Sequence, residues 1–136
     1  MRVCLDTNVL VAAFATRGLC ADVLRAVLAE HDLVIGDVIL EELRRVLASK
    51  LKVPPDRIAA IDAVFAPFPC IPKPVAPGPS TIPDPADRLV FATAVAGHAE
   101  VLVTGDRDLL AIQDTGSVRI LSPRAFWELL RAGEKG

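Results

Sequence analysis

Short apolar runs alternate with longer segments of helical pattern along this chain, and that alternation restricts its fold more than any other feature. Four runs are rich in Val, Leu and Ile, as is typical of strands buried on both faces of a parallel sheet. They span residues 2–5, 33–35, 101–104 and 118–121. The sequence therefore predicts an α/β fold, a three-layer α/β/α sandwich with a central, mostly parallel sheet of four to five strands.

The segments between the runs repeat apolar residues at every third or fourth position, as amphipathic helices do. Asn8 is a residue type that caps helices, so we expect it to begin the first one. Proline fits the first turn of a helix and favours starts near Pro54, Pro85 and Pro123. Helices are expected from Asn8, over 20–31, over 38–51, from about 54, over 85–98, near Leu109 and from Pro123.

Eight of the eleven prolines lie between Pro67 and Pro85. Proline lacks a backbone N–H and breaks helices, so residues 67–85 are predicted to form a stiff surface connection. Only a short edge strand around Cys70 and Ile71 fits within it.

Size and composition indicate one globular domain. With 136 residues, 52% of them hydrophobic, the chain can bury a single core, and we assign residues 1–132 to it. Residues 133–136 are expected to be a frayed tail. The net charge of −2 gives no general attraction to nucleic acid or membranes, which weakens the interpretation as a simple binding module.

The cysteines and the N-terminal segment argue against other classes. Cys4, Cys20 and Cys70 form no CxxC pair, which disfavours a zinc site or a disulfide framework and indicates reduced thiols packed as small apolar residues. The apolar run from Val9 to Ala15 is too short for a secretory signal or a membrane span. A cytoplasmic protein without membrane association is therefore expected.

Four acidic residues stand where predicted elements begin or end. Asp6 follows the first strand, and Asp106 follows the strand over 101–104. Because the carboxyl ends of parallel strands meet at one edge of a sheet, these two aspartates are expected on the same side. The alternative is that each is an ordinary turn or capping residue. The four residues are Asp6, Glu42, Asp87 and Asp106.

Glu42 can be compared directly with its neighbour Glu41. At about 100° per residue, with Ile39 as origin, Glu42 lies roughly 60° away and Glu41 roughly 160° away on the predicted helix. Glu42 thus borders the buried stripe, whereas Glu41 faces water. A carboxylate at a core boundary costs desolvation unless a partner such as a metal ion compensates. The alternative is that Glu42 extends to solvent.

Asp87 lies in the first turn of a predicted helix that begins Asp84-Pro85-Ala86-Asp87. Asp84 fits the cap and Asp87 is favoured by the helix dipole, so both roles could be structural. A carboxylate in this turn can also point at a site shared with the strand ends. The two roles need not compete.

Charged residues beside these acids are weaker candidates. Arg88 and Arg107 each adjoin a candidate ligand and could contact a phosphate, although an arginine beside an aspartate is usually a solvated pair. Asp108 is either an outer ligand or a first-turn residue. His31 and His98 each close a predicted helix, where a cation is favourable, so we assign them no catalytic role.

Converging carboxylates need a compensating charge. Two carboxylates about 4 Å apart repel by roughly 4 kcal/mol at an effective dielectric near 20, so three or four require a divalent cation or a raised pKa. Hard oxygen ligands suit Mg²⁺ or Mn²⁺. If the fold brings the four acids together, the sequence predicts a metal-dependent phosphodiesterase.

Four segments, in this order, resemble the PIN domain family. They are VCLDTNVL at 3–10, ILEEL at 39–43, DRLVFA at 87–92 and LVTGDRDL at 102–109. The resemblance spans nearly the whole chain and points most to the VapC ribonucleases, toxins of bacterial and archaeal toxin–antitoxin pairs. It implies a parallel sheet between helices, often in a homodimer.

Carried over residue by residue, the resemblance implies that four acids bind one or two Mg²⁺ or Mn²⁺ ions. These are Asp6, Glu42, Asp87 and Asp106. Asn8 and Thr104 would support them, and Asp108 and Asp84 are secondary candidates.

We therefore hypothesise a divalent-metal-dependent endoribonuclease, with an RNA substrate and a small antitoxin protein as partners. Two alternatives stay open. The chain could be a scaffold that binds RNA or protein with little catalysis, or an aspartyl-phosphate phosphatase or receiver-type domain with Asp6 as nucleophile. The second fits poorly, because such phosphatases usually carry an aspartate two residues on, where this chain has Asn8.

Overall fold

The computed structural model describes residues 1–76, 81–112 and 115–135. The predicted elements are all found there, and their ends differ from the prediction by at most two residues where both ends were predicted. The strands are β1 Arg2–Leu5, β2 Asp32–Gly36, β3 Cys70–Ile71, β4 Val101–Val103 and β5 Arg119–Leu121. The helices are α1 Thr7–Ala15, α2 Leu19–Glu30, α3 Asp37–Ser49, α4 Pro55–Phe65, α5 Pro85–Ala96, α6 Arg107–Leu110 and α7 Pro123–Lys135.

The strands form one sheet in the order β3-β2-β1-β4-β5, and every described pairing is parallel. In the central strand β1, Cys4 lies beside Val34 of β2 and Leu102 of β4. The chain winds outward from β1 to β3 and then crosses back to form β4 on the other side of β1. Sites in such folds form beyond the carboxyl strand ends at this reversal. The predicted sheet is confirmed.

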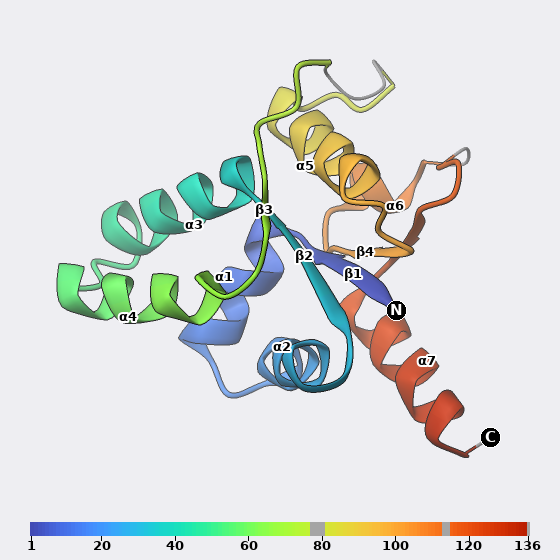
Figure 1. The fold of residues 1–136 in the computed structure, drawn as a ribbon, viewed down its shortest axis with the longest axis horizontal. Coiled ribbons are helices and arrows are strands. Elements are labelled where there is room, and N and C mark those ends of the chain that lie inside the picture. The colour runs from blue at the N-terminus through green and yellow to red at the C-terminus, as the bar shows by residue number, and fades with distance from the viewer. Residues whose placement is uncertain (77–80, 113–114, 136) are drawn as a thin grey trace.

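Helices cover both faces of the sheet (Figure 1). On one face α2 packs against α1, α7 and β2, whereas α5 lies on the opposite face and packs over β2 and β4. α3 packs against α1, α4 and α5. The predicted three-layer sandwich is confirmed, and α3 and α5 meet near the carboxyl ends of the strands.

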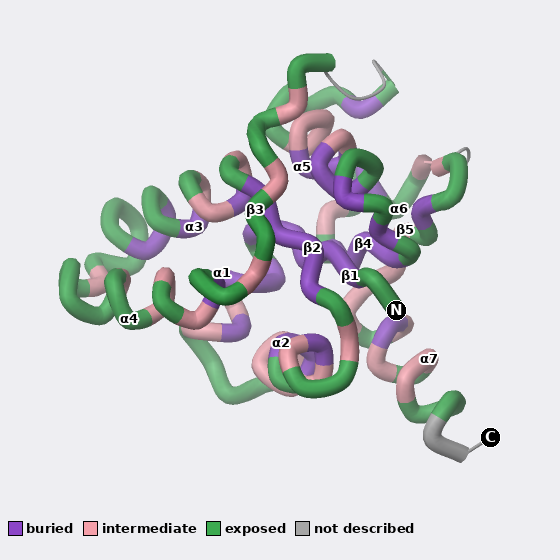
Figure 2. Tube along the Cα trace, in the orientation of Figure 1, coloured by how far each residue is buried: buried purple, intermediate pink, exposed green. Residues whose placement is uncertain are grey.

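The strands carry the core, which is the purple centre of Figure 2. Val3, Cys4 and Leu5 of β1 are fully buried, as are Leu102 and Val103 of β4. Strands covered on both faces need apolar residues at successive positions, which is why they read as continuous apolar runs. The helices contribute single buried stripes, such as Ile39, Leu43 and Leu47 in α3.

Asp6, and not Asn8, caps the first helix. Asp6 has extended backbone angles, and its Oδ1 accepts a hydrogen bond of 2.7 Å from the Thr7 N–H, where α1 begins. The cap predicted at Asn8 is wrong, because the helix already begins at Thr7, and the residue before it is Asp6, which caps helices as strongly as an asparagine does. The carboxylate at the end of β1 is therefore also the cap of α1.

The proline-rich connection is anchored on both sides of residues 77–80, which lie outside the described part of the chain. Before them, β3 pairs with β2 at the edge of the sheet, as predicted. After them, Ile82 is fully buried. Arg88 donates hydrogen bonds to the carbonyls of Ile82 at 2.5 Å and Pro83 at 3.4 Å. These contacts fix the approach to α5.

The cysteines are free thiols, as predicted. Cys4 is buried in β1 and matches the predicted apolar packing. Cys70 does not, because it is exposed and its Sγ donates a hydrogen bond of 3.0 Å to Asp37 Oδ1. This bond and burial of the sulfur raise the pKa of the Cys70 thiol to about 11, with burial as the larger cause.

The last helix is longer than predicted. α7 continues through Gly133 to Lys135, so the helix includes residues that the sequence assigned to a frayed tail, and Gly136 lies outside the described residues. The tail was expected to fray because the last residues of a domain are usually poorly ordered unless they are held in place. Among the described residues, no helix has the length and apolar character needed to cross a membrane.

Two glycines let α5 lie close to β2. A Cβ on Gly97 would lie 2.3 Å from Val34 Cγ1, and a Cβ on Gly36 would lie 2.5 Å from Thr93 Cγ2. Both distances are well below van der Waals contact. The Gly97 carbonyl also accepts two hydrogen bonds from the Arg2 guanidinium, at 2.6 and 2.9 Å, which tie the end of α5 to β1.

We predict that Gly97→Ala lowers the free energy of unfolding by about 1–3 kcal/mol, because Val34 is a stiff, buried neighbour that cannot move away from the added methyl group. Urea titration followed by circular dichroism measures this. Gly133→Ala is the matched control, since a Cβ there meets nothing within 4 Å and alanine favours a helix. Equal stability of the two variants would contradict the proposed close packing.

Candidate metal centre

The acidic residues come from three places that meet at the carboxyl ends of β1 and β4. Asp6 follows β1, Asp106 lies three residues after Val103, the last residue of β4, and Asp87 lies in the first turn of α5. The charges of Asp106, Asp6 and Asp84 all act on Asp87, and those of Asp6 and Asp84 act on Glu42. The fold thus brings together acids that are far apart in the sequence.

Asp6 is the most enclosed of these acids, with 4% of its surface exposed. Its Oδ1 accepts the Thr7 N–H at 2.7 Å, and its Oδ2 accepts the Thr104 hydroxyl at 2.7 Å. Burial raises the pKa of Asp6, the two hydrogen bonds lower it, and the charge of Asp106 adds a smaller increase. The net shift is upward, so the charged form lacks full compensation.

Thr104 joins the two strand-end acids. Its buried hydroxyl donates to Asp6 Oδ2 and accepts the Asp106 N–H at 3.0 Å. One side chain therefore orients the Asp6 carboxylate and the backbone at Asp106. The role of Thr104 in supporting metal ligands, which the sequence resemblance suggested, stays a prediction.

Asp106 caps the short helix α6. Its Oδ1 accepts the N–H groups of Asp108 at 2.8 Å and Leu109 at 3.2 Å. Asp108 and Arg107 are exposed on that helix. Asp108 therefore lies in the first turn of α6, which was one of the two positions predicted for it. Its role as an outer ligand stays a prediction.

Of the acids in the cluster, Asp87 has the most strongly raised pKa. Its partial burial, the charges of Asp106, Asp6 and Asp84, and a hydrogen bond shared with Asp106 raise its pKa to about 7. Burial is the largest cause and the charge of Asp106 the next. A divalent cation would offset the repulsion among these carboxylates and so favour the charged form of Asp87.

Glu42 lies at the edge of the cluster and is 32% exposed. Burial and the charges of Asp6 and Asp84 raise its pKa, while Arg45, whose Nη2 is 3.8 Å from Glu42 Oε1, opposes the shift. Glu41 is exposed. The predicted contrast between the two glutamates is confirmed, whereas the metal-binding role of Glu42 stays a prediction.

The remaining candidates lie at the rim. Asp84 caps α5 by accepting the Ala86 N–H at 2.9 Å, and its charge reaches both Asp87 and Glu42. Asn8 is exposed, and its supporting role stays a prediction. The Arg88 guanidinium binds backbone carbonyls, which gives it a structural role that the sequence pattern did not indicate.

Thr7 directly follows Asp6 and was not among the predicted site residues. Thr7 is 2% exposed, and its Oγ1 is a buried side-chain atom without a hydrogen-bond partner in the described part of the chain. Burying an unpaired hydroxyl is costly. Its place directly after the strand-end aspartate was the signal that could have singled it out.

The donor set fits a hard divalent cation. Within the described ranges, no three His, Cys, Asp or Glu side chains are already as close together as a metal site requires, so an ion would have to draw the carboxylates inward. The negative charges that act on Asp87 favour a cation here. The unpaired Thr7 hydroxyl favours an additional polar contact. Carboxylate oxygens suit Mg²⁺ or Mn²⁺.

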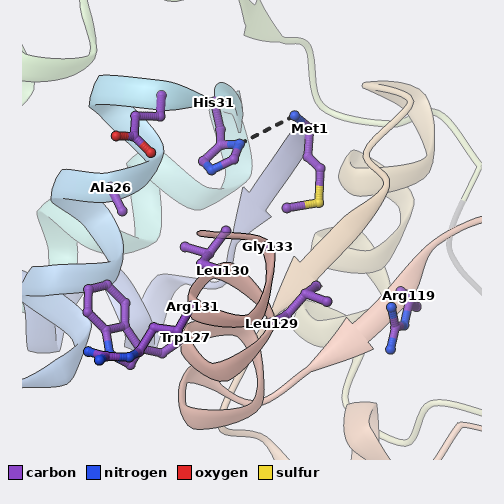
Figure 3. Close-up of a pocket in the computed structure, with 10 residues that line it drawn as sticks. Met1, Ala26, His31, Arg119, Trp127, Leu129, Leu130, Arg131 and Gly133 are labelled. Carbon is purple, nitrogen blue, oxygen red and sulfur yellow. Dashed lines mark hydrogen bonds between the residues drawn. The ribbon is translucent and has the colours of Figure 1, made fainter. Parts of the chain in front are cut away.

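A separate cavity lies away from the acids. It has a volume of about 560 Å³ and lies between α2 and α7 (Figure 3). Met1, His31 and Arg119, which line it, stand at the amino ends of β1, β2 and β5. This cavity therefore lies at the amino ends of the strands, whereas the acids lie at the carboxyl ends. Among its described lining residues, Glu30 is the one carboxylate.

Comparisons with known proteins agree with this architecture. A family model described as PIN domain matches residues 2–108. The crystal structure of VapBC2 from Rickettsia felis, bound to a DNA fragment from their promoter, contains a chain similar to this one with a TM-score of 0.66 and 18% sequence identity. The similarity covers 90% of this chain and 98% of that chain.

A second solved structure, FitAcB from Neisseria gonorrhoeae, is similar with a TM-score of 0.59 and 17% identity, over 90% of this chain and 98% of that chain. At these identities the two structures show a shared fold. A search of curated proteins gave no significant match.

We predict that metal-free protein loses stability as the pH rises from about 4 to 7. The folded pKa of Asp87 is about 7 and its unfolded pKa about 3.9, so in this window the native state binds the extra proton and raising the pH favours unfolding. Asp87→Asn should flatten this dependence. Urea titrations in a chelator at several pH values measure the difference, and parallel curves for both proteins would contradict it.

Proposed function

The chain belongs to the PIN domain family, and from this premise we propose that it is a divalent-metal-dependent endoribonuclease. Its substrate would be RNA, and its role that of the toxin in a toxin–antitoxin pair. The observation that carries the proposal is the meeting of Asp6, Asp106 and Asp87 beyond the carboxyl ends of β1 and β4. Burial there, followed by the charges of Asp106, Asp6 and Asp84, raises the pKa of Asp87. Acids crowded in this way have the chemistry that a Mg²⁺ or Mn²⁺ site needs.

Each carboxylate would have a role that follows from its position. Asp6 and Asp106 are fixed by backbone N–H groups and by Thr104, so the other carboxylates would have to move toward them when an ion binds. Asp87 would complete the ligand set from α5, and Glu42 would approach from α3 and position the attacking water. When bound, the ion supplies a Lewis acid that polarises the phosphoryl group and lowers the pKa of water.

The proposed partner is a small antitoxin protein. VapBC2 from Rickettsia felis, which has a similar fold, is described as bound to a DNA fragment from their promoter. We propose that this chain likewise pairs with an antitoxin protein. An antitoxin could inhibit the site by inserting a basic side chain among the carboxylates, because a cation there relieves the same repulsion as a metal ion. We also propose a homodimer and a cytoplasmic location.

The aspartyl-phosphate alternative has less support. A nucleophilic aspartate needs an oxygen open to in-line attack on phosphorus. Asp6 is 4% exposed, and each of its oxygens already accepts a hydrogen bond. An inert binding scaffold has less support as well, because it would gain nothing from crowded acids that raise the pKa of Asp87 and Glu42.

We predict that Mn²⁺ stabilises the protein against heat and urea. An ion that binds the native state alone adds about 2.7 kcal/mol at one hundred times its dissociation constant. Calorimetric titration and thermal unfolding at constant ionic strength measure the effect, and Asp106→Asn should weaken it. If Mn²⁺ binds neither protein, the metal centre is refuted.

We predict that Asp6→Asn removes metal-dependent cleavage, by about 100-fold or more, because it removes a proposed ligand, while asparagine still caps α1. Cleavage of structured RNA and single-stranded DNA is measured with Mg²⁺, Mn²⁺ or chelator. The matched control is Asp32→Asn, since Asp32 is an exposed aspartate at the amino end of β2. Unchanged activity of the Asp6 variant would refute the assignment.

A further inference from the structure

A second cavity adjoins the acidic cluster. It has a volume of about 300 Å³ and lies between α3, α5 and the proline-rich connection. Glu42 forms part of its wall, and Ala86, directly before Asp87, forms another part. We call this cavity the α3–α5 cleft. Any chain seated in it would pass next to the proposed metal ligands.

Two cations from separate segments converge on the α3–α5 cleft. Arg45 lies one turn after Glu42 on α3, and its side chain is 65% exposed. Lys73 belongs to the proline-rich connection, after β3, and is exposed. Because proline restricts the backbone around Lys73 and β3 fixes its start, the ammonium group stays near the cleft. Both cations can reach a ligand without first breaking a buried contact.

The charge balance of the α3–α5 cleft depends on the metal site. Arg45 and Lys73 are opposed there by Glu41 and Glu42. If a divalent cation takes Glu42 as a ligand, the cations exceed the remaining negative charge. The cleft would then attract a phosphate at the same time as the neighbouring site becomes able to cleave one.

The floor of the α3–α5 cleft is apolar. Val38, Leu89 and Val90 line it, and the first two are half-buried. Apolar side chains offer a base the flat, water-excluding contact that a charged rim cannot. Because its volume is only about 300 Å³, the cleft would take in part of a single strand and not a duplex.

We infer that the α3–α5 cleft binds one nucleotide of single-stranded RNA next to the scissile phosphodiester, with its phosphate on Arg45 and Lys73 and its base against Leu89 and Val38. This inference rests on the proposed ribonuclease function. Phosphate contacts of this kind set the register of a strand without reading its sequence. The cleft thereby gives the acidic cluster a directional substrate path.

The competing explanation is that Arg45 is only a partner of Glu42. Their N–O distance is 3.8 Å and both side chains are partly exposed, so this ion pair contributes little to stability. Lys73, for its part, could be an ordinary solvated side chain. In that case neither residue would affect RNA affinity beyond a general charge effect.

The test is the salt dependence of RNA binding. Fluorescence anisotropy of a labelled single-stranded RNA is measured with Ca²⁺ at several salt concentrations, because Ca²⁺ binds oxygen ligands in a looser geometry than Mg²⁺ and is chosen to keep the RNA intact. For single strands, each lost phosphate contact lowers the slope of log affinity against log salt by about 0.7. Arg45→Ala and Lys73→Ala should each remove about one contact, and the double variant about twice that.

Two controls separate contact from charge. Arg131→Ala removes one positive charge from the opposite edge of the sheet and should leave the slope unchanged. Arg45→Lys keeps the charge and should retain most of the slope. Equal slopes for wild type and the double variant would overturn the inference. It would also be overturned if Arg131→Ala lowered the slope as much as Arg45→Ala does, or if wild type did not bind RNA.

Failure of the two proposals can be told apart. If wild type cleaves RNA and the double variant binds with an unchanged slope, the α3–α5 cleft is not the path, although the ribonuclease assignment stands. If wild type binds RNA through Arg45 and Lys73 and yet cleaves nothing with Mg²⁺ or Mn²⁺, the cleft is upheld and the proposed catalysis is refuted. Thermal unfolding of each variant confirms that these exposed substitutions leave the fold intact.

Discussion

The hydrogen bond from the Thr104 hydroxyl to Asp6 joins two positions 98 residues apart in the sequence, and the acidic site depends on it. It forms because β1 and β4 are neighbours in register, with Leu5 beside Val103. Both strands therefore end at the same level of the sheet. The same hydroxyl accepts the Asp106 N–H, so the backbone that carries the second acid is fixed by the group that orients the first.

Capping and metal binding need not be alternatives in this fold. Asp6, Asp84 and Asp106 each cap a helix with one carboxylate oxygen. A carboxylate has two oxygens and several lone pairs, so one oxygen can hold the helix start while the rest of the group stays available. Three helix starts thus aim at one place, and the positive ends of their dipoles offset part of the repulsion among the acids.

The strands, the order of elements and the contrast between Glu41 and Glu42 could be predicted from the sequence because they depend on local periodicity. The burial of Cys4 and the ends of β1 and β4 follow from the same signal. The backbone contacts of Arg88 and the unpaired hydroxyl of Thr7 could not, because each depends on what lies opposite in space. Arg88 illustrates the difference, since its partner is the carbonyl of Ile82, six residues back in a segment without periodicity.

The proline-rich connection links the two halves of the site. It leaves the sheet at β3, presents Lys73 to the α3–α5 cleft, and returns through buried Ile82 and the carbonyls held by Arg88 to the cap at Asp84. The position of α5, and with it Asp87, is set at one end by these contacts and at the other by the close approach of Gly97 to Val34. A flexible connection would leave Asp87 free to move away from Asp6 and Asp106 and so relieve their repulsion. The contacts of Ile82, Pro83 and Asp84 at the start of α5 therefore help to keep the carboxylates crowded before an ion binds.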